Sequence, residues 1–368
     1  MSIEWSTFSW NPTIGCSPVS PGCAHCYAQE QAFKLRRMGN LDYDGLTKSG
    51  PQHALWTGVI KKMPQRLAEP LHKRKPQVIF VNSMSDLFHP KVSNEFIAAV
   101  FGIMAATPQH QYIILTKHIE RAAEFFKWIR TAQLSEPWEG ARMGQARELS
   151  VCAMQLCAEA ETDKDRDEFG NIWDVANVVT FLNRTGWPLP NVWLGPSLES
   201  YAMVAKRAEA TLAITQLGWN IVLSCEPLLD DLCAKGVALG AIAGAAESRL
   251  WVIAGGESGE NARSCDIDWL RKLRDACAMF KVPFYCKQLG SQPVYRTMKN
   301  FAAPGGGAIN AFLNAGEPLR HPRGGDPAEW PEELRVFQAP PAIAKILNDH
   351  HKRQVTWLEP AVPANESK

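Results

Sequence analysis

The sequence contains no apolar run long enough to cross a membrane, and no signal peptide precedes its first cysteines. Its formal net charge is only +1 at pH 7, so it lacks the strong basic excess of many nucleic-acid-binding proteins. A disulfide framework also fits poorly, because most of the ten cysteines are scattered along a long chain without an exported context. These absences predict a cytoplasmic protein that makes no membrane contact and keeps its thiols reduced.

The composition is that of an ordinary enzyme. Of the 368 residues, 46% are hydrophobic, which is enough to bury a large core in one α/β domain or in two smaller ones. The first 75 residues hold ten Lys and Arg residues but only five acidic residues. This excess either faces a phosphate-bearing substrate or forms solvated helix faces. We favour solvated faces, because the basic residues do not form a continuous stripe.

Short β-rich apolar runs recur along the chain, as buried parallel strands do. They are residues 78–81, 112–115, 192–194, 221–223, 251–254 and 282–285, and a further strand is expected around Trp5–Trp10. Apolar residues at helical spacing lie between them, over 94–106, 119–130, 200–217 and 266–280. This alternation predicts an α/β fold, with parallel strands in a partial or open (β/α) barrel.

Two segments depart from this rhythm. Residues 131–190 form an insertion with a helical stretch at 142–162. That stretch contains Cys152 and Cys157, which share a helix face poorly, so we favour core packing over a second metal site. Residues 1–290 are therefore expected to form the barrel domain, and residues 291–368 a loop-rich C-terminal cap and tail.

The densest chemistry lies in Cys16, Cys23 and Cys26, which have C-x6-C-x2-C spacing on a stretch rich in Pro and Gly. Such a loop can bring three thiolates to one metal centre. A structural zinc ion takes four protein ligands, whereas a 4Fe-4S cluster held by three cysteines leaves one iron open. A Cys3His zinc site with His25 is the main alternative, and unligated thiols are a further one.

Polar residues follow each predicted strand, where a barrel gathers them on one face. They include Asn82, Ser83, Asp86, Lys117, Glu199, Glu226, Glu257 and Lys287. The run Gly255-Gly256-Glu257-Ser258-Gly259 lacks the G-x-G-x-x-G order of dinucleotide-binding loops. Its glycines either permit a ligand to approach the backbone or form a tight structural turn.

Several longer motifs occur in order along the chain. They are residues 10–13 with the cysteine motif, 81–89, 223–228, 255–259 and 330–336. Together they resemble the phage Gp37/Gp68 family, also called the three-Cys-motif family, over nearly all of residues 1–340. That family is in turn similar to radical S-adenosylmethionine (SAM) enzymes.

The resemblance implies a 4Fe-4S cluster on Cys16, Cys23 and Cys26, whose open iron binds SAM. An electron from a donor such as a flavodoxin or ferredoxin then splits SAM to a 5′-deoxyadenosyl radical. The C-x6-C-x2-C motif is three residues longer than the usual C-x3-C-x2-C, and Gly-Gly-Glu follows the sixth strand instead of the second.

We therefore assign SAM contacts to residues that follow the second, fifth and sixth strands. These residues are Asn82, Ser83, Asp86, Glu226, Gly255, Gly256 and Glu257. Lys117, Glu199 and Lys287 are expected to face the substrate, for which a nucleotide or nucleic-acid base is the first hypothesis and a peptide the second. The alternative function is a zinc-stabilised binding protein that works with a partner and catalyses nothing.

Overall fold

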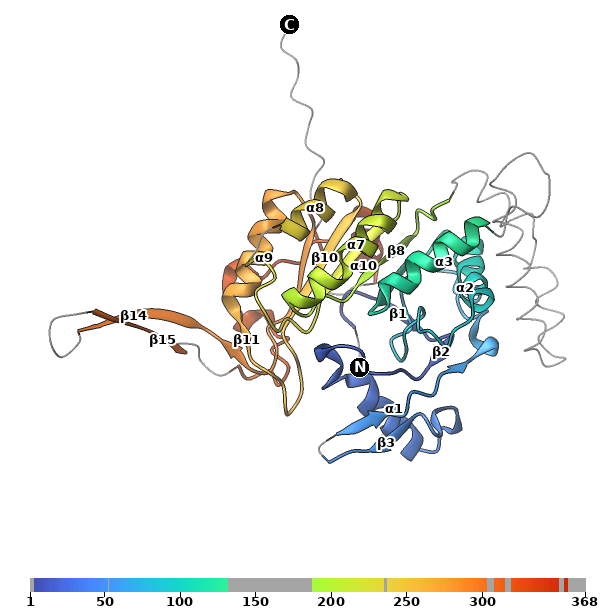
Figure 1. Ribbon diagram of the computed structural model, residues 1–368, viewed down its shortest axis with the longest axis horizontal. Coiled ribbons are helices and arrows are strands. Elements are labelled where there is room, and N and C mark those ends of the chain that lie inside the picture. Colours follow the sequence, from blue (N-terminus) through green and yellow to red (C-terminus); the bar gives the residue numbers. More distant parts are fainter. Residues whose placement is uncertain are drawn as a thin grey trace, which may run out of the picture.

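A seven-stranded sheet forms the centre of the protein and curls into a partial barrel (Figure 1). The structure is a computed structural model that describes residues 3–51, 53–131, 187–234, 237–302, 308–314, 319–350 and 354–356. The strands, in spatial order, are β1 (Phe8–Trp10), β6 (Val78–Val81), β7 (Gln111–Thr116), β8 (Val192–Pro196), β9 (Asn220–Cys225), β10 (Leu250–Gly255) and β12 (Phe284–Gln288). All neighbouring pairs are parallel, which confirms the predicted α/β partial barrel.

Helices cover the outer face of this sheet. They are α2 (Asn94–Ala106), α3 (Ile119–Thr131), α7 (Tyr201–Gln216), α8 (Val237–Ala246) and α9 (Ile267–Met279). Helix α2 has the predicted bounds, α3 is one residue longer at its end, and α7 and α9 are one residue shorter at each end. Helix α8 was not predicted, because its Ala- and Gly-rich sequence has little polar contrast between faces.

The two faces of the sheet have separate cores, because side chains alternate along a strand. Ile79 and Val81 join the outer core beneath the helices, whereas Val78 and Phe80 join an inner core. Helix α10 (Pro341–Asp349) lies in the inner core and ends where His350 contacts the carbonyl of Pro76, just before β6. The hollow of the barrel is therefore filled from the amino ends of the strands.

Two predicted strands are shifted along the sequence. The last strand was expected at 282–285 but is β12, so Lys287 and Gln288 lie within the strand instead of after it. The first strand begins at Phe8, and Trp5 instead packs against Phe80 in the inner core with ring centroids 4.8 Å apart.

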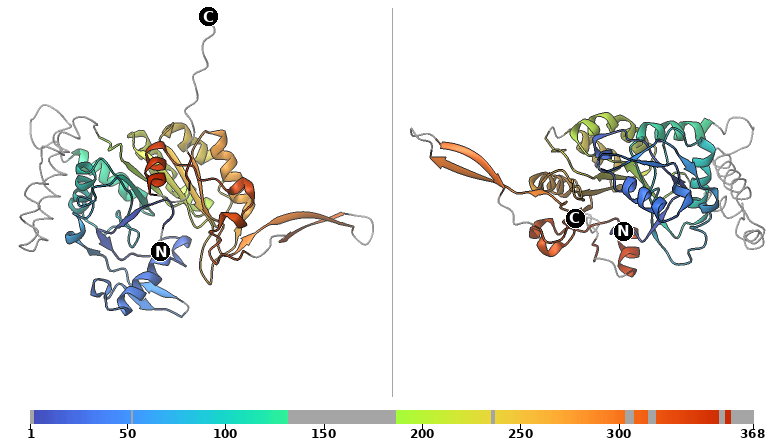
Figure 2. Two further views of the ribbon diagram at one scale, coloured as in Figure 1. Left: turned by 180° about the vertical axis from the view of Figure 1, so that it is seen from behind. Right: turned by 90° about the horizontal axis from the view of Figure 1, so that it is seen from below.

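The segment after residue 290 is more than a loop-rich cap. Strands β14 (Arg296–Ala302) and β15 (Ala308–Asn314) form an antiparallel hairpin that projects from the body (Figure 2). The chain then returns through η5 (Pro327–Glu329), η6 (Glu332–Leu334) and α10. Trp330 and Leu334 are buried in the outer core and α10 in the inner one, so the core continues across residue 290.

An N-terminal lobe, residues 11–66, projects beside the sheet (Figure 1). It contains β2 (Thr13–Ile14), η1 (Pro21–Cys23), α1 (Tyr27–Arg37), η2 (Leu41–Tyr43), β3 (Thr47–Ser49), β4 (Ala54–Trp56), β5 (Lys61–Lys62) and η3 (Pro64–Arg66). Its small core includes Ile14, Ala32 and Trp56, and Met84 from the loop after β6 joins it. The lobe is therefore attached at the carboxyl end of β6.

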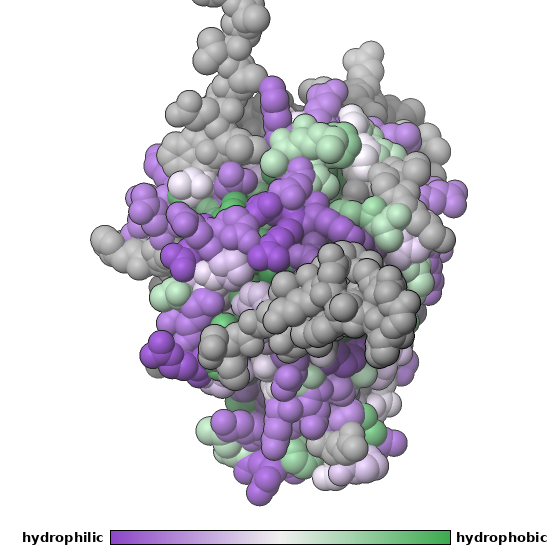
Figure 3. Space-filling model, turned by 90° about the vertical axis from the view of Figure 1, so that its left-hand side faces the viewer, coloured by the Kyte–Doolittle hydropathy of each residue, from purple (hydrophilic) through white to green (hydrophobic). Residues whose placement is uncertain are grey.

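The face in Figure 3 carries mostly hydrophilic side chains, with hydrophobic ones in small groups.

The expected helical stretch at 142–162, with Cys152 and Cys157, lies outside the described residues. Among the helices that are described, none is long and apolar enough to cross a membrane.

Candidate metal centre at the carboxyl ends of the strands

The three cysteines lie on one loop, residues 15–26, which we call the cysteine loop. It begins at Gly15, whose φ of +92° and close approach to Val59 admit no side chain, since a Cβ would lie 2.1 Å from the Val59 carbonyl oxygen. Cys23 ends the 3-10 helix η1, and Cys26 is the residue immediately before α1. The turn at Gly15, the 3-10 helix η1 and the start of α1 thus position the three thiols on one short segment.

The thiols lie close enough to affect one another. Burial raises the pKa of Cys16 and of Cys26, and the neighbouring thiols raise both further. Asp86 adds to the rise at Cys16, whereas Lys117 opposes it at Cys26. The raised pKa disfavours the thiolate forms of Cys16 and Cys26, which a bound cation would favour.

Cys23 is fixed most firmly. Its sulfur accepts a hydrogen bond from the backbone N–H of Val19 at 3.5 Å and lies 3.7 Å from the Ser20 hydroxyl. The side-chain amide of Gln29 donates to the Cys23 carbonyl at 3.0 Å and accepts from the N–H of Trp56 at 2.9 Å. Gln29 therefore links the cysteine loop to the hairpin of the lobe.

A first carboxylate–arginine pair holds the loop from the end of β8. Glu199 is fully buried, accepts from the Gly22 N–H at 3.3 Å and pairs with Arg207 of α7 at 2.9 Å. Burial tends to raise the pKa of Glu199, but Lys117, Ser20 and Arg207 together keep it below the usual value. This residue was expected to face substrate; the structure sets it against the cysteine loop instead.

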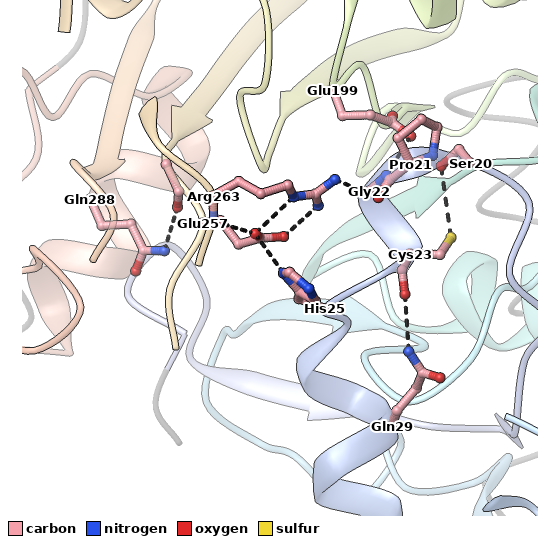
Figure 4. Close-up of polar contacts among 11 residues, drawn as sticks. Ser20, Pro21, Gly22, Cys23, His25, Gln29, Glu199, Glu257, Arg263 and Gln288 are labelled. Carbon is pink, nitrogen blue, oxygen red and sulfur yellow. Dashed lines mark hydrogen bonds and ion pairs between the residues drawn. The ribbon is translucent and has the colours of Figure 1, made fainter. Parts of the chain in front are cut away.

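A second such pair holds the loop from the end of β10 (Figure 4). Both oxygens of Glu257 accept from the Arg263 guanidinium, at 2.6 and 3.0 Å, and Oε2 also lies 3.0 Å from His25 Nδ1. Arg263 in turn donates to the Pro21 carbonyl at 3.0 Å. Burial tends to raise the pKa of Glu257, but these hydrogen bonds outweigh it and lower the pKa.

The loop after β6 contacts the start of the cysteine loop, where the Gly15 N–H donates to the Met84 carbonyl at 3.0 Å and His89 Nε2 lies 3.0 Å from the Ser17 hydroxyl. Asn82 exchanges hydrogen bonds with Thr13, and the Ser83 hydroxyl donates to the Asn11 side chain at 3.2 Å. Asp86 accepts from the Thr116 hydroxyl at 2.7 Å and from the Lys117 N–H at 2.8 Å. The sequence assigned Asn82, Ser83 and Asp86 to SAM, and in the structure their side chains bind the protein itself.

Some side chains near the cysteine loop have polar atoms that make no hydrogen bond within the described residues. Glu226 Oε1 is buried and lies 3.1 Å from Lys287 Nζ, an ion pair whose geometry does not make a hydrogen bond. The Lys117 ammonium lies near Cys26 and Glu199 and has no hydrogen bond or ion pair within the described residues. The Tyr27 hydroxyl donates to the Ser83 carbonyl at 2.8 Å, and 42% of this residue is exposed.

Gly255 and Gly256 are required by packing between strands. A Cβ on Gly255 would lie 2.9 Å from the Gln288 carbonyl oxygen, and one on Gly256 would lie 2.2 Å from that of Leu289. The side chain of Gln288 also donates to the Gly256 carbonyl at 2.9 Å. Of the two interpretations of this glycine run, the contacts favour the structural one, in which β10 and β12 approach each other closely.

No group of three His, Cys, Asp or Glu side chains in the described part of the chain is arranged to hold one metal ion. A zinc ion needs all its ligands within about 2.0–2.3 Å, whereas three cysteines on a 4Fe-4S cluster bind three different irons. His25 Nδ1 lies 3.0 Å from Glu257 Oε2, and a carboxylate at one ring nitrogen leaves the other nitrogen able to bind a metal, so the Cys3His alternative stays open.

The comparisons with known proteins give a family. The family described as "Protein of unknown function (DUF5131)" matches residues 1–312. The chain belongs to this DUF5131 family. Neither the curated proteins nor the solved structures that were compared contain a match.

In this DUF5131 chain, the sequence analysis missed Arg207 and Arg263. Each pairs with a carboxylate that holds the cysteine loop, and we call the Glu199–Arg207 and Glu257–Arg263 pairs the two loop clamps. Arg207 lies on α7, the helix that follows β8 and Glu199, and it is only 1% exposed. Arg263 lies six residues after Glu257 in a loop with little pattern. The spacing of Glu199 and Arg207, eight residues apart across a strand-to-helix turn, was a usable signal.

Proposed function

We propose that this protein is an iron-sulfur enzyme that uses SAM to begin radical chemistry. One observation carries the proposal: three free thiols are presented together at the carboxyl ends of an all-parallel partial barrel, by a loop that two carboxylate–arginine pairs hold in place. This is the end of the sheet at which parallel α/β folds build their active sites. When bound, the cluster would supply the electron that cleaves SAM.

The chain's own residues have three tasks in this proposal. Cys16, Cys23 and Cys26 would hold three irons of the cluster and leave the fourth open for SAM. The Glu199–Arg207 and Glu257–Arg263 pairs keep the loop in one conformation before any metal arrives, so binding orders little further structure.

The polar groups without hydrogen bonds are the ones available to ligands. Glu226 Oε1 offers an acceptor for the ammonium group of SAM, and Lys117 and Lys287 offer donors to the substrate. A charge-assisted hydrogen bond of this kind contributes about 1.5–3 kcal/mol. Asn82, Ser83, Asp86, Gly255 and Gly256 shape the surrounding loops, and any contact they make with SAM would come from their backbone groups.

Anaerobic reconstitution tests the proposal. Protein given iron and sulfide without oxygen should bind about four irons and four sulfides and absorb broadly in the visible range. Addition of SAM should change the electron paramagnetic resonance spectrum of the reduced protein. Stoichiometric zinc in protein purified without oxygen, with no iron uptake, would contradict it.

A further inference from the structure

One side of helix α1 carries exposed residues, Glu30 among them, and starts at the candidate metal centre. Ala28, Gln29 and Ala32 are buried, whereas Tyr27 is 42% exposed and Met38, just after the helix, is 72% exposed. Lys34 and Arg37 are exposed as well. With 3.6 residues per turn, Tyr27, Lys34 and Met38 lie on one stripe, and Arg37 lies one turn beyond Lys34.

The cations on this stripe are not neutralised by the lobe. Arg36, on the opposite side of the helix, pairs with Asp44 at 2.6 Å. The Glu30 carboxylate accepts from the backbone N–H of Ala54. Lys34 and Arg37, by contrast, form no ion pair within the described residues, so their charges are available to a partner.

Tyr27 places an aromatic ring at the thiol end of the stripe. Its hydroxyl donates to the Ser83 carbonyl at 2.8 Å, which ties one end of the ring to the loop after β6, while 42% of the residue is open to solvent. A ring held at one end and open elsewhere suits stacking, because little side-chain freedom is lost when a ligand binds.

We propose that this stripe binds a single-stranded polynucleotide, with one base stacked on Tyr27 beside the thiols and flanking phosphates against Lys34 and Arg37. The two cations lie roughly 10 and 15 Å from Tyr27 along the helix axis, by the rise of about 1.5 Å per residue. This separation suits the backbone of nucleotides next to a stacked base. Bases inside a duplex cannot reach a ring in this way, which selects the single strand.

This proposal rests on the proposed function only in taking the stacked base as the substrate of the enzyme. Binding of the polynucleotide itself can be measured without a cluster. The probes are fluorescein-labelled 12-nucleotide single strands of DNA and of RNA and the corresponding DNA duplex, titrated with iron-free protein at several KCl concentrations. We expect a single strand to bind at least tenfold more tightly than the duplex. The DNA and RNA arms identify which polymer is preferred.

Three variants separate the contributions. Tyr27→Ala should weaken single-strand binding roughly 5- to 150-fold without changing its salt dependence, and Tyr27→Phe should restore most of it. Lys34→Ala/Arg37→Ala should weaken binding and reduce the salt slope by about 1.4, since each phosphate contact on a single strand contributes about 0.7. The matched control Lys206→Ala/Lys345→Ala removes two exposed lysines of the barrel helices and should bind like wild type.

The proposal is overturned if no single strand binds at low salt, if the control variant loses as much as Lys34→Ala/Arg37→Ala, or if polyglutamate competes as well as an oligonucleotide. Iron uptake is measured on the same preparations. Normal cluster formation without oligonucleotide binding would reject this inference alone, whereas binding without iron uptake would reject the proposed function alone. Circular dichroism of each variant excludes unfolding as the cause.

Discussion

Two sets of cysteines in this protein differ in what surrounds them. Cys16, Cys23 and Cys26 lie on an irregular loop that charged side chains hold at the carboxyl ends of the strands. Cys225 and Cys277 lie in β9 and α9 inside the outer core, and Cys277 lines an apolar cavity of about 20 Å³. Burial raises the pKa of Cys16, Cys26, Cys225 and Cys277 alike.

The comparison shows that burial alone does not distinguish the loop thiols from the core thiols. The loop thiols are held by hydrogen bonds and ion pairs from distant strand ends, whereas the core thiols are held by packing. A substitution that removes charge should therefore affect the first set and leave the second unchanged.

The largest effect is expected from the thiols themselves. Cys16→Ala, Cys23→Ala or Cys26→Ala should each abolish iron uptake, because two thiolates cannot retain the cluster. Cys277→Ala should keep full iron content and lose only stability, as a buried side chain is shortened. Iron and sulfide analysis after reconstitution measures both, and equal iron loss in Cys277→Ala would mean that the site is misplaced.

The next effect concerns the buried clamp. Arg207→Met leaves the Glu199 carboxylate buried without its partner and should cost about 3–5 kcal/mol of unfolding free energy. Glu199→Gln/Arg207→Met removes the unpaired charge and should recover part of that loss. Urea unfolding of the two variants decides this, and a double variant no more stable than Arg207→Met would show that the pair is not the cause.

A smaller effect is expected at the second clamp, because Arg263 is 32% exposed. Glu257→Gln weakens the contacts with Arg263 and His25 and should increase hydrogen exchange at residues 20–25 by roughly tenfold or more, since a charge-assisted hydrogen bond contributes about 1.5–3 kcal/mol. Exchange in β9 and α9 serves as the internal control. An unchanged loop would remove Glu257 from the clamp.

Low pH should destabilise the cysteine loop before it destabilises the outer core that holds Cys225 and Cys277. Glu199 and Glu257 both have a lowered pKa in the folded protein, so the stability they contribute is present above their unfolded pKa of about 4.3 and is lost as pH falls through the folded values. Below about pH 4 we expect residues 20–25 to lose protection before β9 does. Pulsed hydrogen exchange followed by mass spectrometry would measure this order. Simultaneous loss in both regions would contradict it.

The smallest effect is expected at the surface of the lobe. The side chains of Arg36 and Asp44 are 42% and 62% exposed, so Arg36→Gln should change the unfolding free energy by less than about 1 kcal/mol. Thermal unfolding beside Arg207→Met gives the contrast between an exposed and a buried pair.

The fold could be predicted from local pattern, because strands such as Val78–Val81 and helices such as Asn94–Ala106 show their burial in their own sequence. The cysteine motif was visible for the same reason. The clamps were not, because Glu199 and Gly22 are separated by 177 residues and Glu257 and His25 by 232. Only the curvature of the sheet brings those pairs together. Helix α1 was also missed, although Ala28, Ala32 and Leu35 have helical spacing.

The distance of 232 residues between His25 and Glu257 has a consequence for the order of synthesis. The cysteine motif leaves the ribosome first, but Glu257 and Arg263 emerge only later, roughly ten to fifty seconds at about 5–20 residues per second. During that interval the nascent chain carries its thiols on an unclamped loop. Any factor that delivers a metal to the finished geometry must therefore act after residues 257–263 have been synthesised.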